Sequence, residues 1–299
     1  MYDEAADAIR NEYGSFLLVN TNFGRANPFK STEDYVDYLV RRQVVQSGEH
    51  AEFHRRFTDF KRRQMQEFQT LLAKLAQSEA GGRILVRPHP SENHNAWRVW
   101  GEPHGIDVRY EGDANAWALA ADAVLHPGCT TGIEALLLDR PTLSFVTEPH
   151  NEFVNLSDMV SDTVHSAPDA VARLIAARSE TGAQRRDRYE SRRDILKPYI
   201  ANLELPYAAD RILDELDSID VNEVDSRAAG VDGPAIDALS KLWGWFNATA
   251  EDQSPLKRQK YARLTNRDIM EPVTCWLRSG MLSRPVRLRE IKQGMFALS

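Results

Sequence analysis

The chain has 299 residues, which is long enough to bury a substantial core as one large domain or two of ordinary size. Hydrophobic residues make up 42% and charged residues 27%, a balance typical of soluble globular proteins that excludes a largely disordered chain. The formal charge of −7 gives no general basic footprint, so no nucleic-acid partner is expected.

Cysteine usage points to a reducing compartment, and hydropathy gives no sign of a membrane span. The two cysteines, Cys129 and Cys275, lack the spacing of a zinc site or of a disulfide framework. No apolar run approaches the roughly 20 residues that span a bilayer. The segment Met1–Glu4 lacks the basic start and apolar core of a signal peptide. We therefore expect a cytoplasmic protein.

The first elements in chain order are a strand, a long helix and a second strand. The apolar run Ser15–Asn20, followed by polar residues and Gly24, predicts a buried strand. From Phe53 to Leu75, apolar residues recur at three- and four-residue steps, which predicts an amphipathic helix. After two glycines, Arg83–Arg87 has the length and β-branched content of a strand that stops at Pro88.

The alternation of strands and helices continues along the chain. Strands are predicted at 108–110, 123–125 and 142–146, and helices at 114–121 and 131–138. This order predicts an α/β fold with a doubly wound parallel sheet, resembling a Rossmann fold.

Beyond Pro168 the pattern becomes helical, with helices predicted at 169–178, 184–196 and 207–216 and no further convincing strand. Residues 217–233 are acidic, polar and glycine-containing, which predicts a linker. The predicted organisation is a nucleotide-sugar-binding domain at 1–216, the linker, and a small helical, basic C-terminal region at 234–299.

The segment 255–292 holds ten Lys or Arg residues against three acidic residues, a local excess of seven positive charges. A solvated surface is one interpretation. Attraction to an anionic membrane face or a lipid-linked glycan is the other, and it would place the protein peripherally at an inner membrane.

Two motifs follow predicted strands, at the sheet edge where open α/β folds bind ligands. The first is Arg87-Pro88-His89-Pro90-Ser91-Glu92, in which two prolines stiffen a turn around His89. An imidazole held in this way can donate a hydrogen bond to a phosphate oxygen and stabilise the charge of a nucleotide leaving group. The alternative is a turn histidine bonded to a nearby carbonyl.

The second motif spans His126 to Leu136 and includes Gly128, Thr130, Thr131, Gly132 and Glu134. Thr130 or Thr131 can cap the following helix, and hydroxyls with N–H groups at its start attract an anion such as phosphate. The alternative is an ordinary capped helix without a ligand. Glu134 fits either a capping box or hydrogen bonds from ribose hydroxyls.

Other candidates lie near the same edge. Asn20, Asn22 and Arg25 follow the first strand and suit contact with a sugar or phosphate, or a structural asparagine turn. His126 is either a crevice residue or a structural histidine, and Glu152, in the loop 148–152, is either a catalytic carboxylate or part of a plain surface loop. Cys129 has no identifiable relay, so a nucleophilic role is not expected.

Several signatures are missing from the sequence. There is no Walker motif, no Gly-x-Gly-x-x-Gly fingerprint and no Gly-x-Ser-x-Gly elbow, so ATPase, dehydrogenase and common hydrolase functions lack their motifs. The pair His50 and His54 lacks the glutamate of a zinc helix, so no metal site is expected.

Taken together, the Arg-Pro-His-Pro turn and the Thr-Thr-Gly-x-Glu-Ala-Leu helix start resemble bacterial surface-carbohydrate biosynthesis proteins. The resemblance covers roughly 15–153 and is to the C-terminal, nucleotide-sugar-binding half of GT-B glycosyltransferases, such as retaining Kdo transferases of capsule synthesis. It implies transfer of a sugar from a nucleotide-sugar donor to a capsule or lipopolysaccharide glycan or glycolipid acceptor, without metal or cofactor.

The same resemblance implies roles for individual residues. His89 would contact the donor phosphate and is, with Glu152, a candidate catalytic residue. Arg87, Gly128 and Gly132 would belong to the donor site with Thr130 and Thr131 at the phosphate, and Glu134 would bind the ribose.

One departure from the family is that only about 14 residues precede the first strand, where such enzymes carry an acceptor domain. A fragment, a partner chain supplying that domain, and a lone nucleotide-binding domain all fit, and we favour the fragment. CMP-ulosonic acids carry one phosphate, which a site of one histidine and one helix start suffices to bind. The competing functions are a non-catalytic nucleotide-binding assembly subunit and a nucleotide-sugar epimerase-like protein.

Overall fold

The computed structural model describes residues 2–29, 35–41, 43–46, 48–147, 152–201, 203, 211–212, 288–292 and 295–298. The chain divides into two compact units, Tyr2–Leu203 and Glu204–Ser299. The candidate site lies within the first unit.

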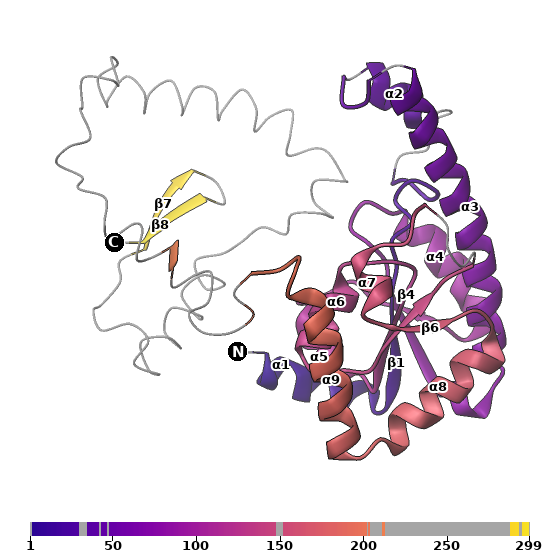
Figure 1. Ribbon diagram of the computed structural model, residues 1–299, viewed down its shortest axis with the longest axis vertical. Helices are drawn as coiled ribbons and strands as arrows, with labels where there is room; N and C mark the ends of the chain where they lie inside the picture. Colours follow the sequence, from indigo (N-terminus) through magenta and orange to yellow (C-terminus); the bar gives the residue numbers. More distant parts are fainter. Residues whose placement is uncertain are drawn as a thin grey trace. The chain divides into compact units, whose positions relative to one another are not determined.

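The first unit is built on a six-stranded parallel sheet in the order β3-β2-β1-β4-β5-β6 (Figure 1). Its strands are β1 (Phe16–Asn20), β2 (Arg83–Arg87), β3 (Asp107–Val108), β4 (Ala123–His126), β5 (Thr142–Phe145) and β6 (Asp162–Val164). The predicted fold class, a doubly wound α/β sheet, is confirmed. Strand order reverses between β1 and β4, so the chain leaves these two strands in opposite directions. In open α/β sheets the crevice that binds ligands lies at such a position, outside the carboxyl ends of the strands.

Strand β1 is buried along its whole length because helices cover both faces of the sheet. Leu17 and Val19 face one core, while Phe16 and Leu18 face the other. The period of two explains why its sequence is a continuous apolar run.

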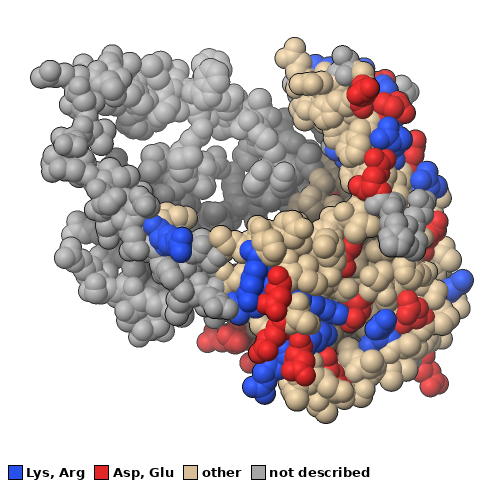
Figure 2. Space-filling model, viewed as in Figure 1, with Lys and Arg blue, Asp and Glu red and all other residues tan. Residues whose placement is uncertain are grey.

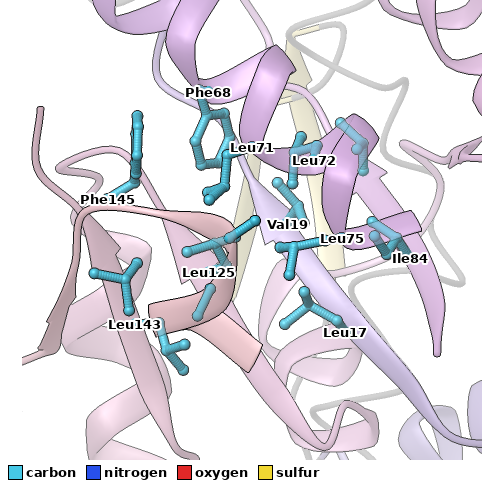
Figure 3. Close-up of a cluster of buried hydrophobic side chains, with 14 of the residues drawn as sticks. Leu17, Val19, Phe68, Leu71, Leu72, Leu75, Ile84, Leu125, Leu143 and Phe145 are labelled. Atoms are coloured by element: carbon cyan, nitrogen blue, oxygen red, sulfur yellow. The ribbon is translucent and has the colours of Figure 1, made fainter. Parts of the chain in front are cut away.

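One face of the sheet is covered by α3 (Glu49–Ala76), α4 (His94–Gly101) and α8 (Ala167–Ser179) (Figure 1). Figure 3 shows Phe68, Leu71, Leu72 and Leu75 of α3 packed over the strands. These residues lie three or four positions apart, on one side of the helix. Burying each such side chain stabilises the fold by about 2 kcal/mol.

The other face is covered by α1 (Asp3–Tyr13), α5 (Ala114–Ala120) and α6 (Thr131–Leu137), and its core includes Tyr13 and Trp117. Helices α7 (Leu156–Met159) and α9 (Gly182–Leu196) join α6 through a smaller apolar cluster. Figure 2 shows basic and acidic side chains intermingled around α9.

The remaining short elements are α2 (Tyr35–Arg41), which packs on the start of α3, and the 3-10 turns η1 (Glu79–Gly81) and η2 (Glu102–His104). Among the described residues, no helix is both long and apolar enough to cross a membrane.

Some elements were not predicted, and each has a weak sequence signal. Helix α1 is polar around most of its surface and buries Ala6 and Tyr13. Strand β6 is a three-residue edge strand whose fully buried residue is Val164. Local pattern is a poor guide to such elements because their packing, rather than their propensity, forms them.

In the predicted helical C-terminal region, the two described stretches form an antiparallel ribbon instead of a helix. It consists of β7 (Leu288–Lys292) and β8 (Met295–Leu298). Strands this short show too few alternations of side-chain direction for a sequence pattern to distinguish them from irregular structure. Most of the predicted helix at 207–216, the linker 217–233 and the rest of the basic segment 255–292 lie outside the described residues.

Candidate functional site

Three turns meet at the carboxyl edge of the sheet, where strand order reverses between β1 and β4. Asn20 at the end of β1 is in register with Arg87 at the end of β2, and Val19 is in register with Leu125 of β4. The segments that follow these strands therefore lie side by side. They contain most of the residues predicted for the donor site.

A buried carboxylate ties the first two turns together. Glu92 is 0% exposed, and its Oε1 accepts hydrogen bonds from the Thr21 hydroxyl at 2.6 Å, from Phe23 N at 2.9 Å and from His89 N at 3.2 Å. Its Oε2 accepts from Trp97 Nε1 at 2.6 Å. Burial raises the pKa of Glu92, while these four donors oppose the shift. Glu92 therefore fixes the loop after β1 against the turn after β2.

His89 is held by its backbone and by its ring. Its N–H reaches Glu92, and its Nδ1 lies 2.7 Å from the Ser91 hydroxyl. Ser91 packs so closely on the loop after β1 that a Cβ on Gly24 would lie 2.3 Å from its Oγ. The expected stiff turn around His89 is therefore part of a network that spans two strand ends.

Arg87 has a different partner from the one predicted for it. Its guanidinium donates to the carbonyls of Glu111 at 2.7 Å and Gly112 at 2.6 Å, and it lies 5.2 Å from the centre of the Tyr110 ring. These contacts order the loop after β3. Burial lowers the pKa of the Arg87 guanidinium.

His126, at the end of β4, supports its turn from inside. It is 0% exposed, and its Nδ1 accepts from Gly128 N at 3.2 Å and Cys129 N at 3.3 Å. Its Nε2 therefore carries the proton and donates to Ser161 Oγ at 2.9 Å. Burial, with the charge of Lys61, lowers the pKa of His126 to about 3. The predicted contact between His126 and a sugar has no place in this arrangement, because both ring nitrogens are used inside the fold.

The two glycines of this turn are required by packing. A Cβ on Gly132 would lie 2.2 Å from His126 Nε2. Gly128 has φ +75°, and a Cβ there would lie 2.6 Å from Asn155 Nδ2. Its carbonyl accepts from Asn22 Nδ2 at 2.9 Å and Asn155 Nδ2 at 3.2 Å. The predicted site residues Asn22 and Gly128 are thus brought together.

The start of α6 is not capped as expected. Thr130 occupies the N-cap position and is exposed, but its side chain makes no capping hydrogen bond. Glu134 forms no capping box, and the residue is exposed. Partial desolvation of its carboxylate, followed by the negative charge of Asp113, raises the pKa of Glu134. The capping interpretation of Thr130 and Glu134 was therefore wrong, since neither side chain is used to complete the helix; Thr131 is the first residue of α6.

The sequence matches no known protein-family model, and no curated protein matches it. One solved structure found by fold comparison is described as "Crystal structure of GtfA/B complex". It has 13% sequence identity and a TM-score of 0.31, and the match covers 67% of this chain and 35% of that chain. This chain thus spans about a third of that chain's length.

Asn20 carries an unsatisfied donor at this edge. Its side chain is 4% exposed, and its Nδ2 has no hydrogen-bond partner within the described part of the chain. A buried donor without an acceptor costs about 1–3 kcal/mol, and native folds rarely leave one unless a water or ligand supplies the acceptor. Asn20 follows Phe16 and Leu18 on the same face of β1, under the helices α5 and α6.

A buried lysine lies beside the β4 turn and was not predicted. Lys61 of α3 donates to Pro127 O and to Gln64 Oε1, both at 2.9 Å, and is 5% exposed. Burial lowers the pKa of Lys61 to about 8. Gln64 in turn donates to Phe145 O at 3.2 Å, so the two side chains tie α3 to the ends of β4 and β5. Lys61 and Gln64 are polar residues within the apolar stripe of α3, and this mismatch is the sequence signal that could have identified them.

Next to Lys61 is a cavity of about 10 Å³, which is the space of one water molecule. Asp158 lines it and accepts from the Ser144 hydroxyl and from Asn155 N. The charge of Asp158 opposes the lowering of the Lys61 pKa. Asn155 and Asp158 form the capping box of α7, which explains how a loop far from the motifs reaches Gly128.

Three other predicted residues are not at the strand ends: Glu152 and Arg25 lie away from them, and Cys129 lies inside the turn after β4. Glu152 forms an ion pair with Arg56 of α3 at 3.2 Å, and both side chains are 50% exposed. Arg25 lies 5.1 Å from the centre of the Phe57 ring. Cys129 is buried, which raises the pKa of its thiol. Residues 148–151 lie outside the described residues, and the described ones include no cluster of three His, Cys, Asp or Glu suited to a metal.

The depressed pKa of His126 predicts a pH-dependent contribution to stability. Between about pH 6.5 and pH 3 the unfolded chain binds a proton at this position and the folded chain does not, so stability falls as pH falls through this window. A His126→Asn variant keeps an acceptor near the position of Nδ1 but has no titrating group. We expect the destabilisation caused by His126→Asn at pH 7 to shrink by about 2 kcal/mol at pH 5.

Urea unfolding of the wild type and His126→Asn at half-unit steps between pH 7 and pH 5 measures this difference. His104→Asn, at the other edge of the sheet, controls for the loss of a histidine from the unfolded chain. Parallel stability curves for the wild type and His126→Asn would contradict a neutral, buried imidazole at this turn.

Proposed function

We propose that the unit Tyr2–Leu203 is the donor-binding half of a GT-B-type glycosyltransferase, with the nucleotide in the crevice between β1 and β4. The observation that carries the proposal is the unsatisfied Nδ2 of Asn20 at the point where strand order reverses. A phosphate, ribose or base oxygen bound there would supply the missing acceptor. The three connected turns around it would be ordered before the ligand arrives, which reduces the entropy lost on binding.

The donor phosphate would lie between the His89 turn and the start of α6. Glu92 fixes the backbone of His89, so the imidazole is held without a cost at the moment of reaction. Thr130 is exposed and makes no capping bond, which leaves its hydroxyl to a ligand, with Thr131 and Gly132 beside it. His89 would stabilise the charge that develops on the leaving phosphate.

Glu134 would bind the ribose of the nucleotide. Glu134 is exposed and its carboxylate is unused by the helix, so it is accessible to the hydroxyl groups of a ligand. Asn22 would act indirectly, since its amide holds the carbonyl of Gly128 in the turn. Arg87 would also act indirectly, by ordering the loop after β3 that borders the crevice.

Of the two catalytic candidates, His89 is favoured over Glu152. The carboxylate of Glu152 is paired with Arg56 on the surface of α3, whereas His89 belongs to the network at the strand ends. The acceptor glycan or glycolipid would be bound by a second domain or by a partner chain. The donor we propose first is a CMP-ulosonic acid for a bacterial surface polysaccharide, because one phosphate suits one histidine and one helix start. No metal or cofactor is needed for this role.

Calorimetric titration of the full chain with CMP, CDP, UMP and UDP tests the proposal. We expect CMP to bind selectively, and Asn20→Ala or His89→Ala to weaken it by about tenfold or more, since each removes a hydrogen bond to a charged or buried polar group. Asn20→Ala should remain folded because its amide donor has no partner to lose.

Two variants away from the crevice serve as matched controls. Asn11→Ala changes an exposed residue of α1, and His104→Ala a residue of η2. Both should bind CMP as the wild type does. If a folded wild-type chain binds none of the four nucleotides, the donor-site proposal is overturned.

A further inference from the structure

A second hollow lies at the amino ends of the strands, at the sheet edge opposite the proposed donor site. It has a volume of about 430 Å³, within the usual range for small-molecule pockets. It is formed by segments that precede β1, β4 and β5 and by the facing parts of α1, α8 and α9. A ligand bound in it would be separated from the donor crevice by the length of the strands.

The lining of this hollow is rich in guanidinium groups, and we call it the arginine cleft. Its charged residues are Arg10, Arg140, Arg178, Arg185, Asp122 and Asp139. The arginines come from four different segments of the chain, so their convergence is a property of the fold and not of a basic sequence run.

Two of the four arginines have clear structural partners. Arg10 donates through Nε and Nη2 to Ala120 O, at 3.1 and 2.8 Å, which satisfies a carbonyl at the end of α5. Arg178 forms an ion pair with Asp122 at 3.8 Å, and Asp122 also accepts a hydrogen bond from Ser15. These two side chains form the fixed wall of the cleft.

Arg140 and Arg185 are poorly compensated. The Nε of each is shielded from solvent and has no hydrogen-bond partner in the described residues. The Nε of Arg185 lies 3.9 Å from Oε2 of Glu180, an ion pair beyond hydrogen-bond distance, and the side chain of Arg185 is 40% exposed. Burial, together with the charge of Arg10 and of Arg185, lowers the pKa of Arg140, while Asp139 opposes the shift. The cleft thus holds two guanidinium groups whose shielded donors lack an acceptor.

We infer that the arginine cleft binds a phosphate-bearing small molecule. A phosphate group presents several oxygens in different directions, which matches guanidinium groups that reach the cleft from α9 and from the loop before β5. Binding would supply acceptors to the shielded Nε atoms of Arg140 and Arg185 and would reduce the repulsion among the arginines. The cleft gives the protein an anion site that is independent of the nucleotide crevice.

The test uses the full chain, in a buffer without phosphate, titrated with inorganic phosphate and with pyrophosphate by calorimetry. We expect one pyrophosphate to bind per chain, with weaker binding of inorganic phosphate. Arg140→Gln and Arg185→Gln should each weaken pyrophosphate binding by about tenfold or more, because each removes charge-assisted hydrogen bonds. Arg186→Gln makes the same charge change at an exposed neighbouring position on α9 and should alter affinity by less than about twofold.

Thermal unfolding distinguishes a binding role from a purely structural one. Without an anion, Arg140→Gln should unfold at a higher temperature than the wild type, because it removes a partly buried charge whose Nε has no hydrogen-bond partner among the described residues. With pyrophosphate the wild type should gain more thermal stability than the variant. The inference is overturned if pyrophosphate does not bind, or if it binds equally to the wild type and to Arg140→Gln. Pyrophosphate bound at the proposed donor site would not be weakened by Arg140→Gln or Arg185→Gln, so these variants separate the inference from the donor-site proposal.

Discussion

Replacing Gly132 by alanine should destabilise the protein by about 3 kcal/mol. The added Cβ would lie 2.2 Å from Nε2 of His126 and 2.7 Å from its Cδ2. The ring has no room to retreat, because it is fully buried and its two nitrogens bind Gly128 N, Cys129 N and Ser161 Oγ. Either these hydrogen bonds break or the start of α6 moves away from β4. Urea unfolding at pH 7 measures the loss.

Gly182→Ala is the matched control for this substitution. Gly182 is the first residue of α9, and a Cβ there would meet no atom within 4 Å. Alanine restricts the unfolded chain more than glycine does, so this variant should be unchanged or more stable by up to about 1 kcal/mol. Equal stabilities for Gly132→Ala and Gly182→Ala would mean that α6 does not pack on the His126 ring as described.

The second large effect is expected at Glu92. Glu92→Ala leaves the donors of Thr21, Phe23, His89 and Trp97 without their shared acceptor, and we expect a loss of about 4 kcal/mol or more. Glu92→Gln keeps one acceptor oxygen but turns an NH₂ group toward a donor, and it should cost about 1–3 kcal/mol.

Chemical unfolding followed by tryptophan fluorescence measures both variants, because Trp97 donates directly to the Glu92 carboxylate. The control is Glu102→Gln, an exposed glutamate of η2, which should change stability by less than about 0.5 kcal/mol. The free energy of unfolding should rise from Glu92→Ala to Glu92→Gln to the control, because fewer hydrogen-bond acceptors are lost at each step. If Glu92→Gln is as stable as Glu102→Gln, the carboxylate does not hold the two loops together.

Much of the fold follows from sequence because its parallel strands are buried on both faces. Continuous apolar runs at β1 and β2, each closed by polar or proline residues, have few other interpretations. The stripe of α3 is long enough for its period to be unambiguous. Short elements such as α7 and β6 depend on partners distant in sequence, and no local pattern specifies them.

For a related reason, the sequence predicted where the residues of the candidate site lie but not what their side chains contact. The positions of His89, Gly128 and Asn22 follow from the rule that ligand-binding loops come after strands, so their neighbourhood was predictable. The partners of each side chain were not. Glu92 accepts from residues on three segments, and Asn155 reaches Gly128 from beyond β5, and these contacts exist only once the sheet has formed.

His126 and Arg87 show most clearly what the sequence could not predict. Both have residue types that bind phosphates, and both stand at strand ends. The alternation along β4 places His126 on the sheet face that α6 covers, where its ring is fully buried. Arg87 donates instead to carbonyls in the loop after β3. Which polar side chains face a ligand depends on loop packing, and spacing alone does not decide it.

The most direct measurement of the central claim is a map of CMP binding by amide chemical shifts in the isotope-labelled full chain. We predict that the largest shifts upon adding CMP occur at Asn20, His89, Gly128 and Thr130, around the crevice between β1 and β4. Small shifts should occur at Arg10 and at other residues of the opposite sheet edge. Shifts confined to that opposite edge, or absent from the whole folded chain at millimolar CMP, would contradict a nucleotide-sugar donor site at this crevice.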